Sequence, residues 1–277
     1  MTGGAALVTV VLLLLAVPVT IVATRIVATR VYDRDVRWLA GATTPTEAYV
    51  VAQYLRRHRL HRLSGGLFGI ALALVIGIRW YGQGGLALGT TSPLADVLFC
   101  GVAGVVVGAL SAETYRLRLP RGGPVAASLA PRPGLPLGRH AWAARAVLAG
   151  SAAVALAAGI AWRDWGGLVA VGCAAVVVAV AEATRRAVAH RRRPVLSERA
   201  QAIDGRFRGF AAASVTRLEL SIAALAAVWA LASLPEDGPW TPVAVAGWLA
   251  GLVVAVVQLR RASPRPPAGF EGATAPR

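Results

Sequence analysis

The sequence predicts an all-α, polytopic membrane helix bundle with about seven transmembrane helices, namely one N-terminal helix followed by three helical hairpins. Of its 277 residues, 56% are hydrophobic and only 15% are charged, whereas soluble domains carry about 25% charged residues. A transmembrane helix needs roughly 17–25 mainly apolar residues. Stretches of this kind lie near Ala5–Ala23, Leu63–Trp80, Pro93–Ala112, Ala144–Trp162, Trp165–Glu182, Leu218–Leu234 and Thr241–Leu259.

The arginines predict the orientation of these spans. The chain contains no lysine, and 27 of its 29 arginines fall in four segments: after the first span, between the third and fourth, between the fifth and sixth, and after the seventh. The other connections carry only Arg79 and Arg163. Because basic loops stay on the cytoplasmic side, we expect the N-terminus outside and the C-terminus inside. We assign the chain to the bacterial plasma membrane as a multi-pass protein.

The first span is expected to be a retained helix. It lacks the positive n-region of a secretory signal, and Arg25 and Arg30 follow its apolar run. The fourth and fifth spans are separated only by "WRDW" (162–165). One helix of their joint length would overshoot a bilayer, so we predict a tight turn there.

Two polar segments precede spans. "TTPTEAYVVAQYLRRHRLHRL" opens with the capping-box spacing of Thr44 and Glu47, with Pro45 at the first helical position. "LSERAQAIDGRFRGFAAASVTRLEL" begins near Ser197. We expect both segments to form helices on or near the inner membrane surface that then turn into a span. Prolines between 120 and 136 indicate an extended linker. Residues 1–262 are expected to form one bundle, and 263–277 a disordered cytoplasmic tail.

The inner ends of the third, fifth and seventh spans resemble one another. Glu113, Glu182 and Gln258 are each followed three residues later by an arginine, at 116, 185 and 261. Self-similarity at a regular period is typical of duplicated units. Sequences rich in Ala, Val and Leu also match by chance, so both explanations stay open.

Four polar residues are candidates for a polar path through the bundle: Glu113, Glu182, Gln258 and Asp96. Acids inside a membrane often mark ion or proton paths. Alternatively, each Glu forms a water-exposed pair with the arginine at i+3, and Asp96 caps the helix that starts after Pro93. Glu219, beside Arg217 at the start of the sixth span, is expected to cap that helix in the same way.

The basic string "YLRRHRLHRL" (54–63) directly abuts a span. Arginines near an anionic leaflet are attracted to it by roughly 1 kcal/mol each, and no recognition element for nucleic acid surrounds them. We therefore expect contact with anionic lipids of the inner leaflet, and none with nucleic acid, at Arg56, Arg57, Arg59, Arg62, Arg191, Arg192 and Arg193.

Small residues recur at four-residue spacing, which lets helices approach closely in lipid. Close helix packing and chance in a chain with 30 glycines are both open for the pairs Gly65 and Gly69, Gly104 and Gly108, and Gly247 and Gly251.

No signature of catalysis accompanies these features. The chain has no Walker motif, HExxH or GxSxG, and its histidines (His58, His61, His140 and His190) lie in arginine-rich segments, where a solvated face is expected. Cys100 and Cys173 are expected to be small core residues. We predict no catalytic residue, no metal site and no cofactor.

The function expected from these features is that of a non-catalytic partner or accessory subunit of a membrane complex, such as a transport complex. Its partners would be membrane lipids together with another membrane protein or a second copy. Two alternatives stay open. The first is a small independent transporter with a polar path near Glu113, Glu182 and Gln258. The second is an intramembrane lipid-modifying enzyme, for which no buried nucleophile or metal site is found.

The stretches "YLRRHRLHRLSGGLFGIAL", "GVVVGALSAETYRLR" and "AIDGRFRGFAAASVTRLELSIAALA" resemble those of a loose group of uncharacterised actinobacterial multi-pass membrane proteins. The resemblance extends over nearly the whole chain. It implies a bacterial cell membrane and no catalytic residues.

Overall fold

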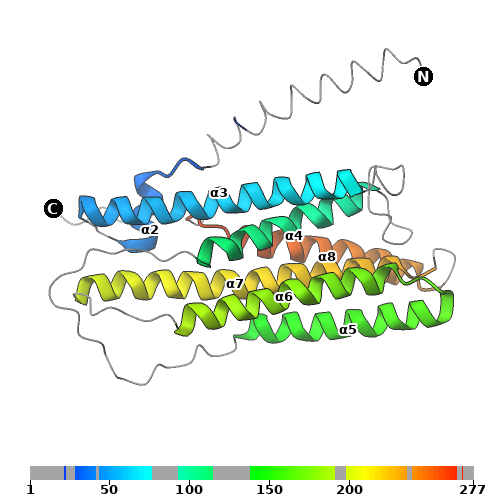
Figure 1. Ribbon diagram of the computed structural model, residues 1–277. Coiled ribbons are helices and arrows are strands. Elements are labelled where there is room, and N and C mark those ends of the chain that lie inside the picture. Colours follow the sequence, from blue (N-terminus) through cyan, green and yellow to red (C-terminus); the bar gives the residue numbers. More distant parts are fainter. Residues whose placement is uncertain are drawn as a thin grey trace, which may run out of the picture.

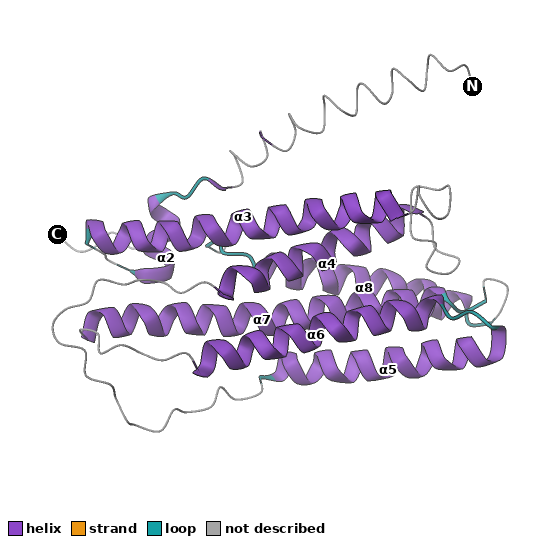
Figure 2. Cartoon of the chain, in the orientation of Figure 1, coloured by secondary structure: helices purple, strands orange, loops and turns teal. Residues whose placement is uncertain are grey.

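The chain folds into a bundle of long helices. The computed structural model describes residues 22, 29–41, 44–76, 93–114, 138–190, 198–235, 239–266 and 270. Within these residues every regular element is helical and no strand occurs, which confirms the predicted all-α class (Figure 2). The elements are α2 (Asp33–Ala40), α3 (Pro45–Ile76), α4 (Pro93–Thr114), α5 (Arg139–Trp162), α6 (Gly166–His190), α7 (Glu198–Ala232) and α8 (Thr241–Arg261).

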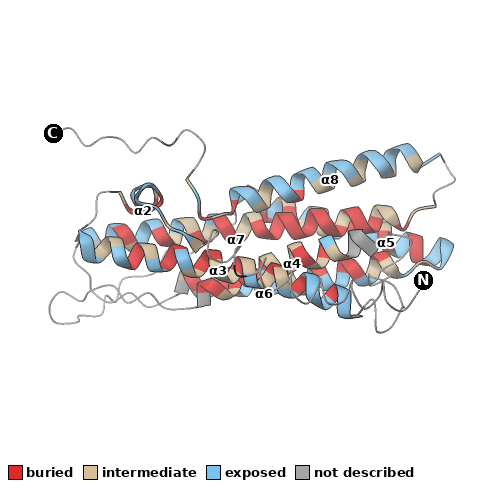
Figure 3. Ribbon diagram, turned by 90° about the horizontal axis from the view of Figure 1, so that it is seen from above, coloured by how far each residue is buried: buried red, intermediate tan, exposed pale blue. Residues whose placement is uncertain are grey.

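Helices α3 to α8 lie alongside one another as long rods, and α2 is a short helix at one end of the bundle (Figure 1). The consecutive pairs α3–α4, α5–α6 and α7–α8 each pack together, as expected for hairpins, and α7 also packs against α4, α5 and α6. In the most apolar segment of α7, 72% of residues are buried, against 6% in α8. Helix α7 is therefore central and α8 peripheral (Figure 3).

Among the described residues, four helices are long and apolar enough to cross a membrane: Arg139–Trp162, Gly166–Ala189, Gln201–Ala232 and Thr241–Arg261. Helix α4 adds a shorter apolar stretch, Val97–Glu113. Of the other predicted spans, the second is described only as far as Ile76, where α3 ends, and the first lies outside the described residues apart from Val22. The apolar side chains exposed on α5, α6 and α8 form the surface that lipid would cover.

Helices α3 and α7 do not turn at the predicted membrane boundary, which corrects the expectation of separate surface helices. Helix α3 has 32 residues and α7 has 35, so at 1.5 Å per residue they are about 48 and 52 Å long. A hydrocarbon core is only about 30 Å thick. No proline interrupts either helix after its first turn, and so nothing forces a bend. Both helices run straight on for several turns beyond the apolar region.

These additional turns pack with α2 into a unit with its own core, which we call the helical extension: α2, residues 45–62 of α3 and residues 198–217 of α7. Its core is built by Val36, Leu39, Ala40, Val51, Tyr54, Leu55, Ile203 and Phe207. The rings of Trp38 and Phe210 meet edge to face at its margin, with centroids 5.7 Å apart. The extension therefore has its own packed interior at the arginine-rich end of the bundle.

Two local predictions are confirmed at helix ends. Helix α3 starts at Pro45 behind a capping box, in which the amide of Thr44 donates to Oε2 of Glu47 at 2.8 Å and the amide of Glu47 donates to the Thr44 hydroxyl oxygen at 3.4 Å. The tight turn at "WRDW" is also present. Arg163 ends α5 in the left-handed conformation with φ 60°, and the amide of Gly166 donates to Asp164.

Glycines bring α3 and α4 into backbone contact. A Cβ atom placed on Gly65 would lie 2.2 Å from the carbonyl oxygen of Gly104, and one on Gly108 would lie 2.1 Å from that of His61. Gly69 meets the backbone of Cys100 in the same way. On α8, Gly247 and Gly251 face side chains of α7. The six glycines singled out in the sequence therefore lie at helix contacts, and at the α3–α4 contact no larger residue fits.

Candidate functional site

A buried polar triad joins α3 to the C-terminal end of α4. The hydroxyl group of Tyr54 donates to Oε1 of Glu113 at 2.6 Å, and Nε2 of His58 lies 3.0 Å from the same oxygen. The exposed fractions of Tyr54, His58 and Glu113 are only 2%, 1% and 4%. Nδ1 of His58 has no hydrogen-bond partner among the described residues. The Tyr54 hydroxyl group and His58 Nε2 thus meet at one carboxylate oxygen.

This triad corrects two expectations. His58 does not lie on a solvated face; its ring is buried and packs against those of Tyr54 and Phe210. Glu113 is not a water-exposed rim residue, because its carboxylate is enclosed by α3. Arg116, its expected partner at i+3, lies outside the described residues.

A second polar cluster, the inner ion cluster, comprises Arg145 of α5, Glu182 and Arg185 of α6, and Glu219 of α7. Oε1 of Glu182 accepts from Nη2 of Arg145, and Oε2 accepts from Nη2 of Arg185 at 2.6 Å and from its Nε at 3.2 Å. Glu182 and Arg185 are buried, whereas the side chain of Arg145 is 37% exposed. The predicted pair of Glu182 with the arginine at i+3, Arg185, is present. It lies inside the bundle, and Glu182 also bonds to a second arginine, Arg145.

Glu219 lies beside this pair and has a different environment. It is 1% exposed, and its Oε1 atom has no hydrogen-bond partner among the described residues. It lies within electrostatic reach of Glu182, Arg185 and Arg145. The expectation that Glu219 caps a helix is wrong, because α7 begins at Glu198 and Glu219 lies well inside it.

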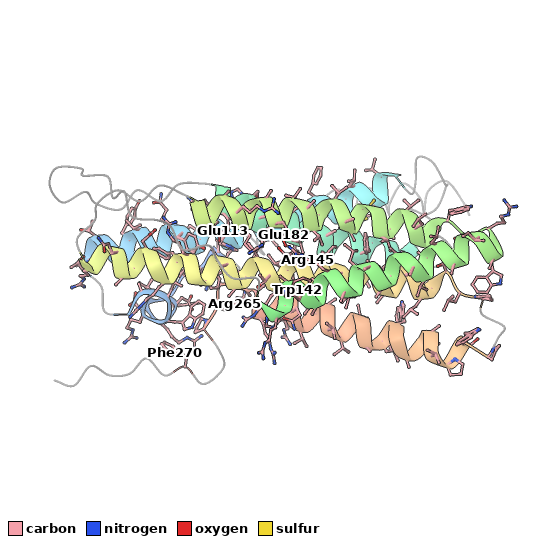
Figure 4. The ribbon with its side chains drawn as sticks, turned by 90° about the horizontal axis from the view of Figure 1, so that it is seen from below. Glu113, Trp142, Arg145, Glu182, Arg265 and Phe270 are labelled. Atoms are coloured by element: carbon pink, nitrogen blue, oxygen red, sulfur yellow. The ribbon has the colours of Figure 1, made fainter. Side chains whose placement is uncertain are left out.

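The predicted path residues do not converge on one site. Figure 4 shows Glu113, Glu182 and Arg145 following one another across the middle of the bundle. Gln258 of α8 lies elsewhere. Ser221 of α7 bonds to the Ala255 carbonyl on the α8 side, and Glu219, two residues earlier, points about 200° away from Ser221. Gln258 and Glu219 are thus on opposite sides of α7. Asp96 belongs to α4, but its side chain lies outside the described residues.

In two hairpins the second helix carries the acid and the first helix supplies a donor to it, although Glu182 also accepts from Arg185 of its own helix. Glu113 of α4 accepts from α3, and Glu182 of α6 accepts from α5. Gln258, the corresponding residue of α8, has an Oε1 atom without a partner among the described residues. The first two hairpins share a donor from the first helix to the acid of the second, and the third hairpin departs from this arrangement.

Two arginines expected at lipid headgroups are buried instead. Arg59 donates to Oδ2 of Asp35 at 2.8 Å and to the Pro264 carbonyl at 3.0 Å. Arg62 donates to the carbonyls of Leu259 and Ala262 at 2.9 and 3.1 Å. Carbonyl groups at a helix C-terminus lack partners within the helix and attract cations, so Arg62 holds the end of α8 against α3. The start of the predicted tail is packed here, since Pro264 is buried.

The other arginines of that group are placed differently. Arg56 is exposed, and Arg57 is half-buried with its guanidinium 5.9 Å from the centre of the Tyr54 ring. Arg191, Arg192 and Arg193 lie outside the described residues. Lipid contact at these five arginines stays a prediction.

The helical extension contains a shallow cavity of about 180 Å³ between α2 and α7. It is lined by Ala40, Gly41, Arg199, Ala202, Ile203 and Arg206. Gly41 has φ +76°, and Nη1 of Arg206 lies 2.7 Å from where its Cβ would be. A cavity with two arginines at its rim is suited to a carboxylate or a phosphate group.

No group of three metal-ligating side chains occurs among the described residues. The arrangement therefore offers three buried carboxyl groups. Glu113 is bonded to a tyrosine and a histidine, Glu182 is bonded to two arginines, and Glu219 lies beside that second group. Tyr54, His58, Arg145 and Glu219 were missed as site residues. The spacing of Val51, Tyr54, Leu55, His58 and Arg62 by three and four residues marks one face of α3 and would have pointed to the burial of His58.

Comparison of the chain with family models, with curated proteins and with solved structures gives no match.

Proposed function

We propose that the chain is a seven-span protein of the bacterial plasma membrane that serves as a non-catalytic partner or accessory subunit of a membrane complex. Four candidate spans support the membrane assignment. The arginines at one end of the bundle support a cytoplasmic location for that end. On this orientation the helical extension projects into the cytoplasm, and the N-terminus lies outside.

The observation that carries the proposal is the continuity of α3 and α7 from the bundle into the extension. Because both helices are unbroken, a force or shift applied to the extension reaches the spans through rigid rods. A module built in this way suits a protein that couples a cytoplasmic partner to a membrane component.

The charge of the extension indicates an acidic partner. Its exposed arginines are Arg34, Arg37, Arg56, Arg199 and Arg206. Along α7, Arg206 and Arg199 lie about 18 and 28 Å beyond Leu218, at 1.5 Å per residue. Charges separated by more than a Debye length, about 8 Å at physiological ionic strength, are largely screened from each other. Arg199 lies well beyond that range and pairs with Glu47 at its own end of the extension, and an acidic protein surface suits the exposed arginines that face the solvent there.

Purification from native membranes in mild detergent tests this proposal. A partner should be enriched with the wild-type protein and lost from the double variant Arg37→Glu/Arg206→Glu. The matched control is Arg186→Glu, which reverses an exposed charge on α6 outside the extension. If the protein runs alone, or if the double variant keeps the same partner at the same yield, the proposal is contradicted.

A second candidate function is that of a small transporter, and the two buried acids Glu113 and Glu182 favour it, because ionisable groups inside a bundle are typical of ion paths. In that case the double variant Glu113→Gln/Glu182→Gln abolishes solute flux in vesicles. Unaltered flux would reject the transporter.

A further inference from the structure

The inner ion cluster treats its two carboxylates unequally. Glu182 accepts hydrogen bonds on both oxygens from Arg145 and Arg185. Glu219 has one oxygen, Oε1, that is buried and accepts from no described residue. Both cations of the cluster are thus hydrogen-bonded to one acid, and the other acid is left beside them.

The cluster lies at one depth in the bundle. Counting from the opposite helix ends at Trp162, Gly166 and Ala232, we place Arg145, Glu182 and Glu219 about 26, 24 and 20 Å along their helices, at 1.5 Å per residue. A hydrocarbon core is about 30 Å thick. The cluster therefore lies within the apolar region and near its arginine-rich end.

An ionised carboxylate is costly in such a place unless it is hydrogen-bonded or paired. Glu182 meets that condition through its two arginines. Glu219 does not meet it at Oε1, and the negative charge of Glu182 nearby adds repulsion. A proton on Glu219 removes the buried charge and the repulsion without disturbing the bonds to Glu182.

The charged groups on the other helices around α7 do not supply a substitute partner. Glu113 of α4 is bonded to Tyr54 and His58. The residue of α8 near this level, Gln258, is uncharged and lies on the other side of α7. Arg217, two residues before Glu219 on α7, donates to the Arg261 carbonyl at the end of α8.

We propose that Glu219 is a proton-binding site inside the bundle, which exchanges its proton with the cytoplasmic side through water that reaches the cluster at Arg145. Arg145 is the most exposed member of the cluster, and its guanidinium lies 5.7 Å from the centre of the exposed Trp142 ring. Figure 4 shows Trp142, Arg145 and Glu182 close together. With the proton bound, two guanidinium groups face one carboxylate, and the cluster gains one positive charge. This inference does not depend on the proposed partner function.

Infrared difference spectroscopy of the full chain in lipid vesicles tests the proposal, because a protonated carboxyl group has a C=O band that a carboxylate lacks. Between about pH 8 and about pH 5, the range in which protein proton switches operate, the wild type should gain this band. Glu219→Gln should abolish it. The matched control is Asp204→Asn on the same helix, which removes a carboxylate paired with Arg208 and should leave the band unchanged.

A second variant keeps the test decisive if Glu219→Gln does not fold. In Glu182→Gln the two arginines lose their anionic partner and can pair with Glu219, which then holds its proton less tightly. The midpoint of the band should fall by at least about one pH unit, the smallest effect usual for a carboxylate beside an arginine. A band that persists in Glu219→Gln, or a midpoint unchanged in Glu182→Gln, would overturn the proposal.

Discussion

The hydroxyl group of Tyr54 donates to the carboxylate of Glu113 across 59 positions of sequence, and both groups are buried. The bond joins the base of the helical extension to the C-terminal end of α4. His58, one turn further along α3, contacts the same oxygen. The extension is thereby attached to the bundle by hydrogen bonds as well as by the continuity of α3.

The first prediction concerns this bond. Tyr54→Phe should lower the free energy of unfolding by about 1.5–3 kcal/mol, because a hydrogen bond to a charged group is lost and the ring is kept. Denaturant titration in detergent measures the change. Tyr49→Phe removes a hydroxyl group from an exposed side chain of the same helix and should change little. Equal effects of the two variants would show that the bond does not stabilise the fold.

The second prediction concerns the contact between α3 and α4. Gly65→Ala forces a methyl group into the Gly104 carbonyl and should destabilise the protein by about 1–3 kcal/mol, as overpacking does. Gly209→Ala is the control. It lies within α7 with open space around its Cβ position and should stabilise the helix by up to about 1 kcal/mol. The melting temperatures should thus move in opposite directions; a shared direction argues against the close contact.

The third prediction concerns the end of α8. Arg62→Ala leaves the Leu259 carbonyl without its side-chain donor and should cost about 1–3 kcal/mol. Amide exchange in the last turn of α8 should accelerate with it. Arg56→Ala, an exposed change on the same helix, should stay within about 0.5 kcal/mol of the wild type. Unchanged exchange in Arg62→Ala would mean that this arginine does not hold the helix end.

The fourth prediction concerns pH. Burial, together with Arg57 and His58, lowers the pKa of His61 below its usual 6.5, and Nδ1 of His61 lies 2.8 Å from the Ser111 hydroxyl oxygen on α4. The folded state therefore binds fewer protons at His61 than the unfolded state. Its stabilising effect is complete above pH 6.5 and is lost as the pH falls through the lowered pKa.

Acidification over this range should lower the melting temperature of the wild type, and His61→Gln should lose part of that decrease. An equally steep decrease in His61→Gln would assign the pH dependence to other groups.

The sequence predicts correctly those local features that depend on residues close together in the chain. The capping box of Thr44 and Glu47 and the turn at "WRDW" depend on residues within a few positions of each other, so their spacing predicts them. The pairs Tyr54–Glu113 and Arg145–Glu182 span 59 and 37 positions. Which side chains meet in these pairs depends on helix rotation and packing, and spacing alone does not give either.

The straightness of α3 and α7 was missed for a related reason. Both segments change from polar to apolar near the predicted membrane boundary, a pattern from which a turn is expected. A change of polarity alone does not bend a helix, because a bend needs a proline, a bulge or an inserted group. Two of the arginines expected at lipid, Arg59 and Arg62, instead donate to carbonyl groups at and just after the end of α8, far from them in sequence.

The central claim is that the arginine-rich end, with the helical extension, faces the cytoplasm. Labelling of single cysteines tests this claim most directly. Cys100→Ser and Cys173→Ser first remove the native cysteines. One variant then carries Arg206→Cys, in the extension, and the other carries Glu236→Cys, in the predicted outer connection. With a membrane-impermeant maleimide on intact cells, we predict labelling at position 236 and none at position 206 until the membrane is permeabilised. Labelling of position 206 on intact cells would contradict the account.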